Sequence, residues 1–482
     1  MSPYLLLGIV AAYFALLLGV AFIASRGADN ESFFVGNRNS NWMLVAFGMI
    51  GTSLSGVTFI SVPGQVGAAA FGYMQIALGQ FAGYFVIAFV LLPLYYRLRL
   101  SSIYRFLDER LGARAHHTGA GIFVVSRTLG ATARLYLVIK ILQELILDRL
   151  GLPFWVTALV ILVLILLYTF EGGVKTIVWT DTLQTAGMLL GLGVCVVYLL
   201  QGLDLSFAQS LTKLSEEGLS KVFVTDLDSS AFWGKQMLAG VFISIAMTGM
   251  DQEMMQKNIS VKRLGDSQKN VVALSIIMLL VVGLFLLLGG LLQLYAVHNG
   301  MPQRGDDLFP AVVLGHLPAW VQIIFIIALI SALFPSADGA LTALTSSTCI
   351  DLLAIDQRGW SDAYKTQVRR RVHIGFALVF FLAVMVFRAI NDPSMIGLIL
   401  KLAGYTYGPL LGLFAFAMFT RRQPRNAWIP WVALAAPLLC WLIDSRQTAW
   451  FGGYRIGLEL LILNGGLTFA GLWLTSAKTT RQ

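Results

Sequence analysis

Long apolar segments recur along almost the whole chain, and they restrict it to a membrane fold. A helix needs a run of about 20 apolar residues to cross a bilayer, and such runs follow one another from the N-terminal end to residue 476. The 482 residues are 57% hydrophobic and only 12% charged, a composition that excludes a soluble enzyme. We therefore predict an all-α polytopic membrane protein that forms a single transmembrane unit over residues 1–482.

Counting the apolar runs predicts about 13 membrane-spanning helices. Their boundaries lie near 3–25, 42–66, 72–96, 118–147, 153–170, 174–201, 231–255, 270–297, 317–350, 372–391, 395–419, 427–443 and 455–476. Three cysteines, Cys195, Cys349 and Cys440, lie far apart within or beside these runs. Their spacing predicts neither a disulfide framework nor a metal-binding cysteine pair.

The basic residues support this number of spans and predict an orientation. Cytoplasmic loops of membrane proteins carry an excess of Lys and Arg. With the N-terminus outside and the C-terminus in the cytoplasm, the basic clusters at 97–114, 257–269, 369–371 and 421–425 all fall inside. The formal net charge of +9 is then explained by loops near anionic lipid headgroups, without nucleic acid. We predict a multi-pass protein of the cell (inner or plasma) membrane.

The span at 42–66 has a polar centre between two apolar ends. This centre holds Gly48, Gly51, Thr52, Ser53, Ser55, Gly56 and Thr58. Glycine disfavours a helix, and hydroxyl side chains compete for backbone hydrogen bonds. An opened backbone persists in hydrocarbon only against protein or beside a water-filled cavity. The segment therefore either offers backbone carbonyls to an ion or solute, or allows close helix packing through small residues.

A second interrupted span occurs where an internal repeat would place it. In the span at 231–255, Thr248 and Gly249 are followed by Asp251, Gln252 and Glu253. Transport proteins built from inverted repeats often carry broken helices at matching positions of the two halves. We predict a leading helix at 3–25, a first repeat at 42–201, an inverted second repeat at 231–419 and two trailing helices at 427–476. This symmetry favours a binding site between the two broken spans.

Five ionisable residues are predicted to lie at membrane depth, where charges are costly and usually functional. Asp181 lies early in the sixth span and is either an interfacial acid favoured by the helix dipole or a ligand. Asp338 is too deep in its span to be a surface charge. Asp251 faces either a cavity or the cytoplasm. Arg134 requires an acidic partner or an anionic solute, whereas Arg127 lies nearer the inside end and is expected to extend to the interface.

The span at 317–350 presents oxygen-bearing and small residues on one helical face. These are Ala332, Pro335, Ser336, Gly339 and Thr342. Pro335 has no amide hydrogen and so frees the carbonyl of Ser331. Oxygens without full negative charge suit Na⁺, whereas Ca²⁺ and Zn²⁺ sites need more carboxylates or His and Cys ligands. We find no hydrolytic triad, HExxH pattern or phosphate loop in the sequence, so no catalytic residue is predicted and the chain is not expected to be an enzyme.

Several motifs in a fixed order give the chain a family resemblance. They are FFVGNRNSNW (33–42), LSGVTFI (54–60), GGVKTIVWTDTLQ (172–184), DQEMMQKNIS (251–260) and SADGALTALTSSTCIDLL (336–353). With these motifs the chain resembles the sodium:solute symporter family over nearly its whole length. The resemblance implies a LeuT-type core of two inverted five-helix repeats, with one helix before it and others after it.

The resemblance also implies ion sites. The main sodium site of the family falls on the carbonyls of Gly51 and Leu54 and on Ala332, Pro335 and Ser336. Proline cannot replace a serine hydroxyl, so the site is either weaker or completed by other oxygens. A second cation site of some members falls on Asp181 and Asp338, with Gly339 beside them. Two carboxylates at one site would bind a cation tightly or share a proton.

Substrate contacts are implied in the same way. Sugar transporters carry a glutamate where this chain has Val57 and an aromatic gate where it has Met254, and both differences count against a hexose. Arg134 falls near the carboxylate-binding arginine of sialic-acid transporters, which favours an anionic solute. The remaining implied contacts are Ser53, Ser55, Thr58, Gln75, Asp251 and Gln252.

The combined prediction is a sodium-coupled symporter that imports a small organic solute by alternating access. Its expected partners are the solute, Na⁺ and the lipid bilayer; the sequence indicates no oligomeric state. Two alternatives remain open at this point. One is a proton-coupled symporter of the same fold, which Asp181 and Asp338 would allow. The other is a transporter-like membrane sensor.

Overall fold

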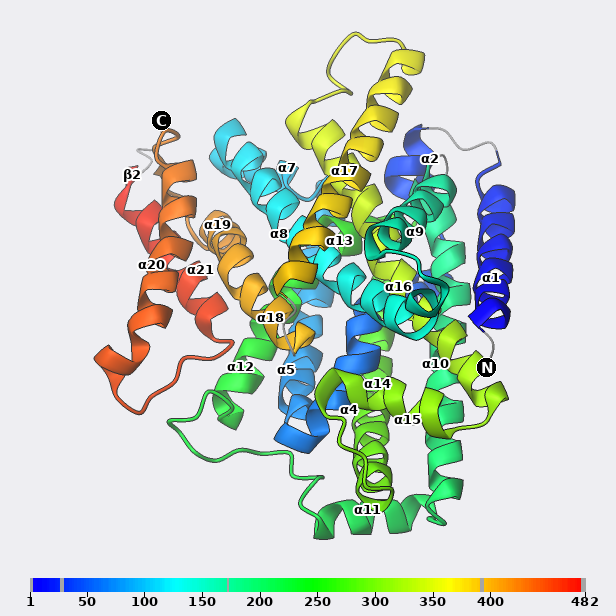
Figure 1. The fold of residues 1–482 in the computed structure, drawn as a ribbon. Helices are drawn as coiled ribbons and strands as arrows, with labels where there is room; N and C mark the ends of the chain where they lie inside the picture. Colours follow the sequence, from blue (N-terminus) through cyan, green and yellow to red (C-terminus); the bar gives the residue numbers. More distant parts are fainter. Residues whose placement is uncertain (1–2, 27–29, 171–172, 391–393, 478–482) are drawn as a thin grey trace.

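The computed structural model describes residues 3–26, 30–170, 173–390 and 394–477 as a bundle of helices (Figure 1). The end of the predicted 372–391 span and the start of the 172–184 motif lie outside these residues. In the first part of the chain the α-helices are α1 (Pro3–Ala24), α2 (Asn30–Val35), α3 (Trp42–Ser53), α4 (Gly56–Ala69), α5 (Tyr73–Val86), α6 (Leu92–Arg97), α7 (Arg105–Leu111), α8 (Ala113–Leu142), α9 (Phe154–Thr169), α10 (Gly173–Gly202) and α11 (Phe207–Glu216).

The rest of the chain is helical as well, apart from one pair of very short strands. The helices are α12 (Trp233–Ser244), α13 (Gln252–Ile259), α14 (Leu264–His298), α15 (Leu308–His316), α16 (Ala319–Ser347), α17 (Asp362–Ile390), α18 (Met395–Thr406), α19 (Gly408–Phe419), α20 (Ile429–Phe451) and α21 (Leu460–Leu474). The strands β1 (Gln423–Pro424) and β2 (Ser476–Ala477) pair antiparallel near the C-terminus.

Short turns of other helix types extend several of these helices. π-helical turns at Ile87–Leu91, Gln143–Leu147, Ile245–Gly249 and Thr348–Leu352 follow α5, α8, α12 and α16. 3₁₀ turns lie at η1 (Gly36–Arg38), η4 (Asp148–Leu150) and η6 (Gly305–Asp307). π-turns inside helices often occur at functional sites, and the one at Ile245–Gly249 lies in the second predicted interruption.

The all-helical membrane fold predicted from the sequence is confirmed. Among the described residues, eight helices are long and apolar enough to cross a membrane, and two bent helix pairs raise the number to ten. The other three predicted spans are the shorter helices α9 and α21, and the interrupted helix formed by α12 and α13. Length and composition thus support up to ten of the thirteen spans.

Both predicted interruptions are present. Helices α3 and α4 meet at 53°, with Leu54 and Ser55 between them. After its π-turn, the α12 segment leaves helical geometry at Met250 and Asp251 and resumes as α13. Asp251 begins α13 because its carboxylate accepts the backbone N–H groups of Glu253 and Met254, which a helix start leaves unpaired.

Helices α10 and α16 pack closely because glycines on α10 face α16. A methyl group added at Gly187 would lie 2.5 Å from the Ser331 hydroxyl, and one added at Gly191 would overlap the Cβ of Ala328. This contact brings the acid-bearing part of α10 beside the segment of α16 around Pro335 (Figure 1).

Replacing Gly191 by alanine should lower the free energy of unfolding by about 1–3 kcal/mol, because the new methyl group overpacks the α10–α16 contact. The matched control is Gly193→Ala, since a methyl group there meets nothing within 4 Å and alanine favours a helix over glycine. Thermal melting of the purified protein in detergent measures both. Equal melting temperatures for the two variants would contradict the close contact.

Candidate ion and solute site

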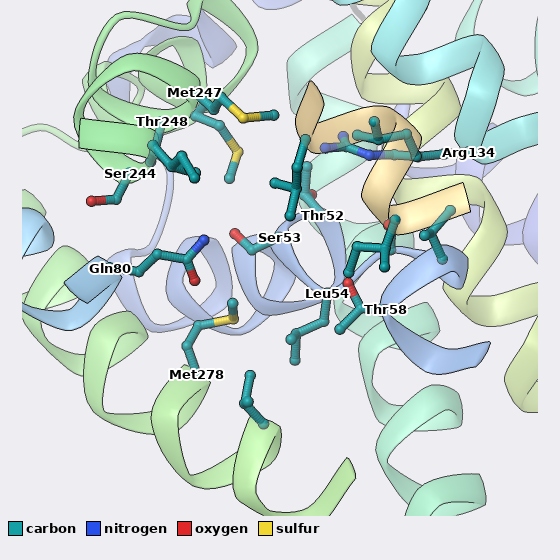
Figure 2. Close-up of a pocket in the computed structure, with 18 of the residues that line it drawn as sticks. Thr52, Ser53, Leu54, Thr58, Gln80, Arg134, Ser244, Met247, Thr248 and Met278 are labelled. Carbon is teal, nitrogen blue, oxygen red and sulfur yellow. The ribbon is translucent and has the colours of Figure 1, made fainter. Parts of the chain in front are cut away.

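A cavity of about 90 Å³ lies at the interruption between α3 and α4 (Figure 2). Its walls come from α3, α4, α5, α8, α12, α13, α14 and α18, with the π-turn after α12. The lining residues are Thr52, Ser53, Leu54, Ser55, Val57, Thr58, Tyr73, Gln80, Tyr84, Arg127, Arg134, Ile243, Ser244, Met247, Thr248, Met254, Met278, Val282, Ile396, Ile399 and Leu400.

Several hydroxyl and amide groups line this cavity. The predicted contacts Ser53, Ser55 and Thr58 line it, and Gln80 of α5 lies opposite Ser53 (Figure 2). Helix α4 begins at Gly56, so its first backbone N–H groups and the positive end of its dipole are at the cavity. A polar or anionic group of a solute is therefore favoured at this point.

Two arginines of α8 line the cavity, but their environments differ. Arg127 is 3% exposed, donates to the carboxylate of Glu253 and lies 3.9 Å from the nearer carboxylate oxygen of Asp251. The expectation that Arg127 extends to the membrane interface is therefore wrong, because these two acids hold it inside the bundle. Arg134 is only partly buried and has no hydrogen bond or ion pair to any described residue.

A chain of buried charges begins on α10 and runs through α13. The Lys257 Nζ lies 2.7 Å from Asp181 Oδ2, 2.7 Å from Thr52 Oγ1 and 3.6 Å from Glu253 Oε1. The sequence predicts that Lys257 lies in a basic cytoplasmic loop. This prediction is wrong, because the residue belongs to α13 and is only 3% exposed. Helix α13 continues for two turns inside the bundle, where the acids of α10 and α13 neutralise the lysine.

The same chain reaches the bend between α18 and α19. The hydroxyl of Tyr407, the residue at this bend, donates to Asp251 Oδ2 at 2.8 Å. Asp251 therefore caps α13 through one oxygen and binds the bend through the other. It is fully buried and does not line the cavity.

The residues implied in the main sodium site are brought together. A methyl group added at Gly51 would lie 3.5 Å from the Pro335 ring, and one at Gly56 would lie 3.7 Å from the Ala332 carbonyl oxygen. The last helical hydrogen bond of α3 runs from the Leu54 N–H to the Ile50 carbonyl, so the carbonyls after Ile50 lie beyond the regular helical pairing. The α3 interruption therefore faces the segment of α16 that carries Ala332, Pro335 and Ser336.

Thr185 of α10 adds a further hydroxyl at this position. Its Oγ1 accepts a hydrogen bond from the backbone N–H of Gly51 at 3.1 Å. Sequence analysis did not single out Thr185, although it lies one helical turn after Asp181. Its oxygen therefore lies directly beside the α3 interruption.

The backbone carbonyls at the second interruption already accept hydrogen bonds from tyrosine side chains. The Tyr95 hydroxyl donates to the Gly249 carbonyl at 2.8 Å, and the Tyr104 hydroxyl donates to the Met250 carbonyl at 3.1 Å. Both tyrosines are fully buried. The two interruptions therefore differ: the second is closed by tyrosines, whereas the first faces the cavity and α16.

The acids of the implied second cation site are fully buried. Asp338 accepts the Tyr168 hydroxyl at 2.8 Å and the backbone N–H of Gly339 at 2.5 Å. A methyl group at Gly339 would overlap the carboxylate of Glu253. The prediction that Asp338 is no surface charge is thus confirmed, and α13 packs directly against this part of α16.

Two of the implied substrate contacts bind backbone elsewhere. Gln75 donates to the carbonyls of Gly72 and Ala231, at 3.1 and 3.3 Å. Gln252 accepts from the N–H of Ile103 at 3.0 Å and donates to the carbonyl of Ser101. Neither glutamine lines the cavity.

Several cavity residues carried little signal in the sequence. Gln80 is the one with a local sign, an amide within the apolar run around residues 76–86. The others come from spans that look uniformly apolar, because only the folded bundle shows which side of such a helix faces a cavity. They are Tyr73, Tyr84, Ser244, Met247, Met278, Ile396, Ile399 and Leu400.

The arrangement is that of a membrane transporter with a central site between broken helices, and comparison with known proteins agrees. Residues 33–427 match the model of the sodium:solute symporter family. The chain belongs to this family. It is a sodium-coupled symporter and not an enzyme, and Na⁺ is accordingly a transported ion and not a cofactor.

Relatives with established names are similar along most of the chain. The sodium/sialic acid symporter NanT of Aliivibrio fischeri is 21% identical, with 94% of this chain and 90% of the relative covered. The human sodium/iodide cotransporter is 24% identical over 86% of this chain, and the human sodium-coupled monocarboxylate transporter 1 is 23% identical over 83%. The chain spans 65% and 66% of these two human proteins.

Solved structures show the same fold. A Na⁺-coupled sialic acid symporter in a substrate-bound outward-open state superposes with a TM-score of 0.82, at 18% identity and with 98% of this chain and 97% of that chain covered. Mhp1, a nucleobase-cation-symport-1 family transporter, superposes with a TM-score of 0.59 at 15% identity, covering 93% of this chain and 94% of its own. The LeuT-like fold expected from the sequence is confirmed.

The Arg127–Glu253 pair should show strong energetic coupling in a double-mutant cycle. Arg127→Met or Glu253→Met alone should cost about 3–5 kcal/mol of stability, because each leaves a buried charge without its partner. The double variant should lose about 1–3 kcal/mol less than the sum of the two. Unfolding of the purified protein in detergent measures all three.

The matched control is the ion pair of Lys140, at the end of α8, and Glu144, in the π-turn that follows. Their side chains are 23% and 52% exposed. Their coupling should stay below about 1 kcal/mol, as for other solvent-exposed pairs. Similar coupling in the two cycles would show that Arg127 and Glu253 do not form a buried pair in the folded protein.

Asp306 of η6 connects the first and second halves of the chain beside the cavity helices. Its carboxylate accepts the Ser61 hydroxyl of α4 at 2.8 Å and the N–H of Met395, the first residue of α18, at 3.4 Å. Burial raises the pKa of Asp306 to about 6. The two hydrogen bonds and Lys140 of α8 act to lower this pKa, and neighbouring Asp307 acts to raise it.

The folded protein should become more stable through Asp306 as the pH falls from 7 to 5. Because its pKa is raised, the buried carboxyl binds a proton between about pH 4 and 6 that a solvated one releases. Asp306→Asn should remove this gain, on the order of 2 °C in melting temperature. Melting curves from pH 7.5 to 4.5 measure it, with the exposed Asp307→Asn as control. An Asp306→Asn profile parallel to the wild-type profile would contradict the assignment.

Proposed function

We propose that this protein imports a small organic anion together with Na⁺. The proposal rests on the surroundings of Arg134. Its guanidinium lines the central cavity without an acidic partner among the described residues, whereas Arg127, two turns earlier on α8, is neutralised by Glu253 and Asp251. A cation at membrane depth without a partner in the protein is costly, and an anionic solute would supply that partner.

Two further features support an anion. The first turn of α4 directs backbone N–H groups toward the cavity. The relatives described above are named as transporters of sialic acid, iodide and monocarboxylates, all of which are anions at neutral pH. The apolar remainder of the lining, including Met247, Met278 and Ile399, suits a small organic body attached to the charged group.

Sodium coupling is assigned to the main site at the α3 interruption. We assign the ion to the carbonyls of Gly51 and Leu54 and to oxygens of Ala332, Pro335 and Ser336 in α16, with the Thr185 hydroxyl in place of the one lost at Pro335. Ser53 and Ser55, which lie between or beside these carbonyls, line the solute cavity. One interruption would therefore serve both ligands, so that each ligand organises the backbone that the other needs.

The proposed cycle is a rocking of the repeats 42–201 and 231–419 around this shared site. We propose an outside N-terminus and a cytoplasmic C-terminus. In support, α7, the beginning of α17 and the strand β2 lie at one end of the bundle, and α11 lies at the other (Figure 1). The end of the bundle with α7 holds most of the basic loops, as expected for the cytoplasmic side.

The test compares Arg134→Gln and Arg134→Lys with wild type. Sialic acid, monocarboxylates, iodide, proline and hexoses are screened by thermal shift with NaCl or choline chloride, and ligands that stabilise the protein are tested for uptake into proteoliposomes. An anion should stabilise the wild type in NaCl. Arg134→Gln should reduce its uptake at least about tenfold, since a hydrogen bond to a charged group contributes about 1.5–3 kcal/mol, and Arg134→Lys should retain part of the uptake.

Lys262→Gln, in the exposed turn before α14, is the control and should transport normally. Unchanged anion uptake by Arg134→Gln would refute the proposed role. Uptake driven by a pH gradient in choline would instead establish the proton-coupled alternative. Ligand binding without uptake or counterflow would establish the sensor.

A further inference from the structure

Lys257 lies where the family resemblance places a second cation. Its ammonium group is 2.7 Å from Asp181 Oδ2, the oxygen that such an ion would require. An ammonium has three N–H donors, and three oxygens surround this one: those of Asp181, Thr52 and Glu253. The ammonium donates to Asp181 and Thr52 and lies within ion-pair distance of Glu253, so it is a buried cation covalently attached to α13.

The side chains around Lys257 leave room for one positive charge. Asp181 and Glu253 are 0% and 1% exposed, and each has a second carboxylate oxygen without a hydrogen bond among the described residues. Gly339 of α16 lies against the same Glu253 carboxylate. A sodium ion bound to Asp181 Oδ2 would have to displace the ammonium from its 2.7 Å contact, and one bound to Oδ1 would share a single buried carboxylate with the ammonium, so that two like charges would lie side by side.

We propose that the Lys257 ammonium is a built-in replacement for the second coupling ion, so that transport is coupled to Na⁺ at the main site only. The inference rests on the proposed function, because it concerns how many ions accompany the solute. It assigns Lys257 the role of a residue that determines ion stoichiometry. An ordinary structural ion pair would involve the same contacts, but its removal would not create a sodium site.

The first test is the dependence of thermal stability on Na⁺ alone, without solute. Lys257→Met removes the charge and keeps most of the side-chain length, which leaves the oxygens of Asp181, Glu253 and Thr52 available to a free cation. The melting temperature of this variant should rise more steeply with NaCl, at constant ionic strength in choline chloride, than that of wild type. An equally shallow response in both proteins would overturn the inference.

The second test is ion stoichiometry in proteoliposomes, from ²²Na⁺ and solute fluxes measured together. Wild type should move about one Na⁺ per solute, and Lys257→Met about two, with a correspondingly higher Hill coefficient for Na⁺. For a monovalent anion the wild-type cycle would then be electroneutral, whereas the variant would respond to a valinomycin-imposed potential. Two Na⁺ per solute in wild type would overturn the inference, even if the variant cannot be purified.

Three further variants separate charge replacement from damage to the fold. Lys257→Arg should retain the wild-type stoichiometry, because it retains the cation. Lys257→Met combined with Asp181→Asn should lose the extra Na⁺ response, since the carboxylate 2.7 Å from the ammonium is then removed as well. Lys262→Met should behave as wild type. If wild-type uptake proves independent of Na⁺, the proposed function itself fails; unchanged stoichiometry in a Na⁺-driven Lys257→Met removes only the present inference.

Discussion

The buried ionic chain from Asp181 through Lys257 and Glu253 to Arg127 joins the parts of the protein that form the site. Its members belong to α10, α13 and α8, and Thr52 adds α3. Buried ion pairs are seldom favourable overall, because desolvation offsets their attraction. They are nevertheless specific, since any shift of α13 along its axis would separate several charges at once. The chain therefore sets the position of α13 and, with it, the geometry of both interruptions.

Small residues complement this polar constraint on the other side of the site. Gly187 and Gly191 let α10 approach α16 until backbone and side chains touch. Helices in a membrane associate through such close packing, because lipid offers no hydrophobic drive to bring them together. Asp181 and Thr185 lie on the same helix as these glycines, so the packing of α10 also decides how far its oxygens stand from Gly51 and Pro335.

The sequence predicts the features that depend on local chemistry. Glycine and hydroxyl residues between Gly48 and Thr58 weaken a helix wherever they occur, and the interruption at Leu54 follows from them. The burial of Asp338 also follows from its distance from either end of an apolar span. Lys257 and Arg127 were misplaced for a shared reason: hydropathy measures the cost of burying one charge and contains no information on the partner that neutralises it. The cavity-lining faces of α5, α14 and α18 depend likewise on contacts between distant segments.

Tyr407 stands at the bend between α18 and α19 and donates its hydroxyl to the acid that caps α13. The bent helix and the half-helix of the ionic chain therefore share one hydrogen bond. Any rotation of α18 about this bend must stretch that bond and disturb the first turn of α13 together with it. A rotation of the helix that carries Ile396 and Ile399 is therefore mechanically linked to the buried charges through this one hydrogen bond.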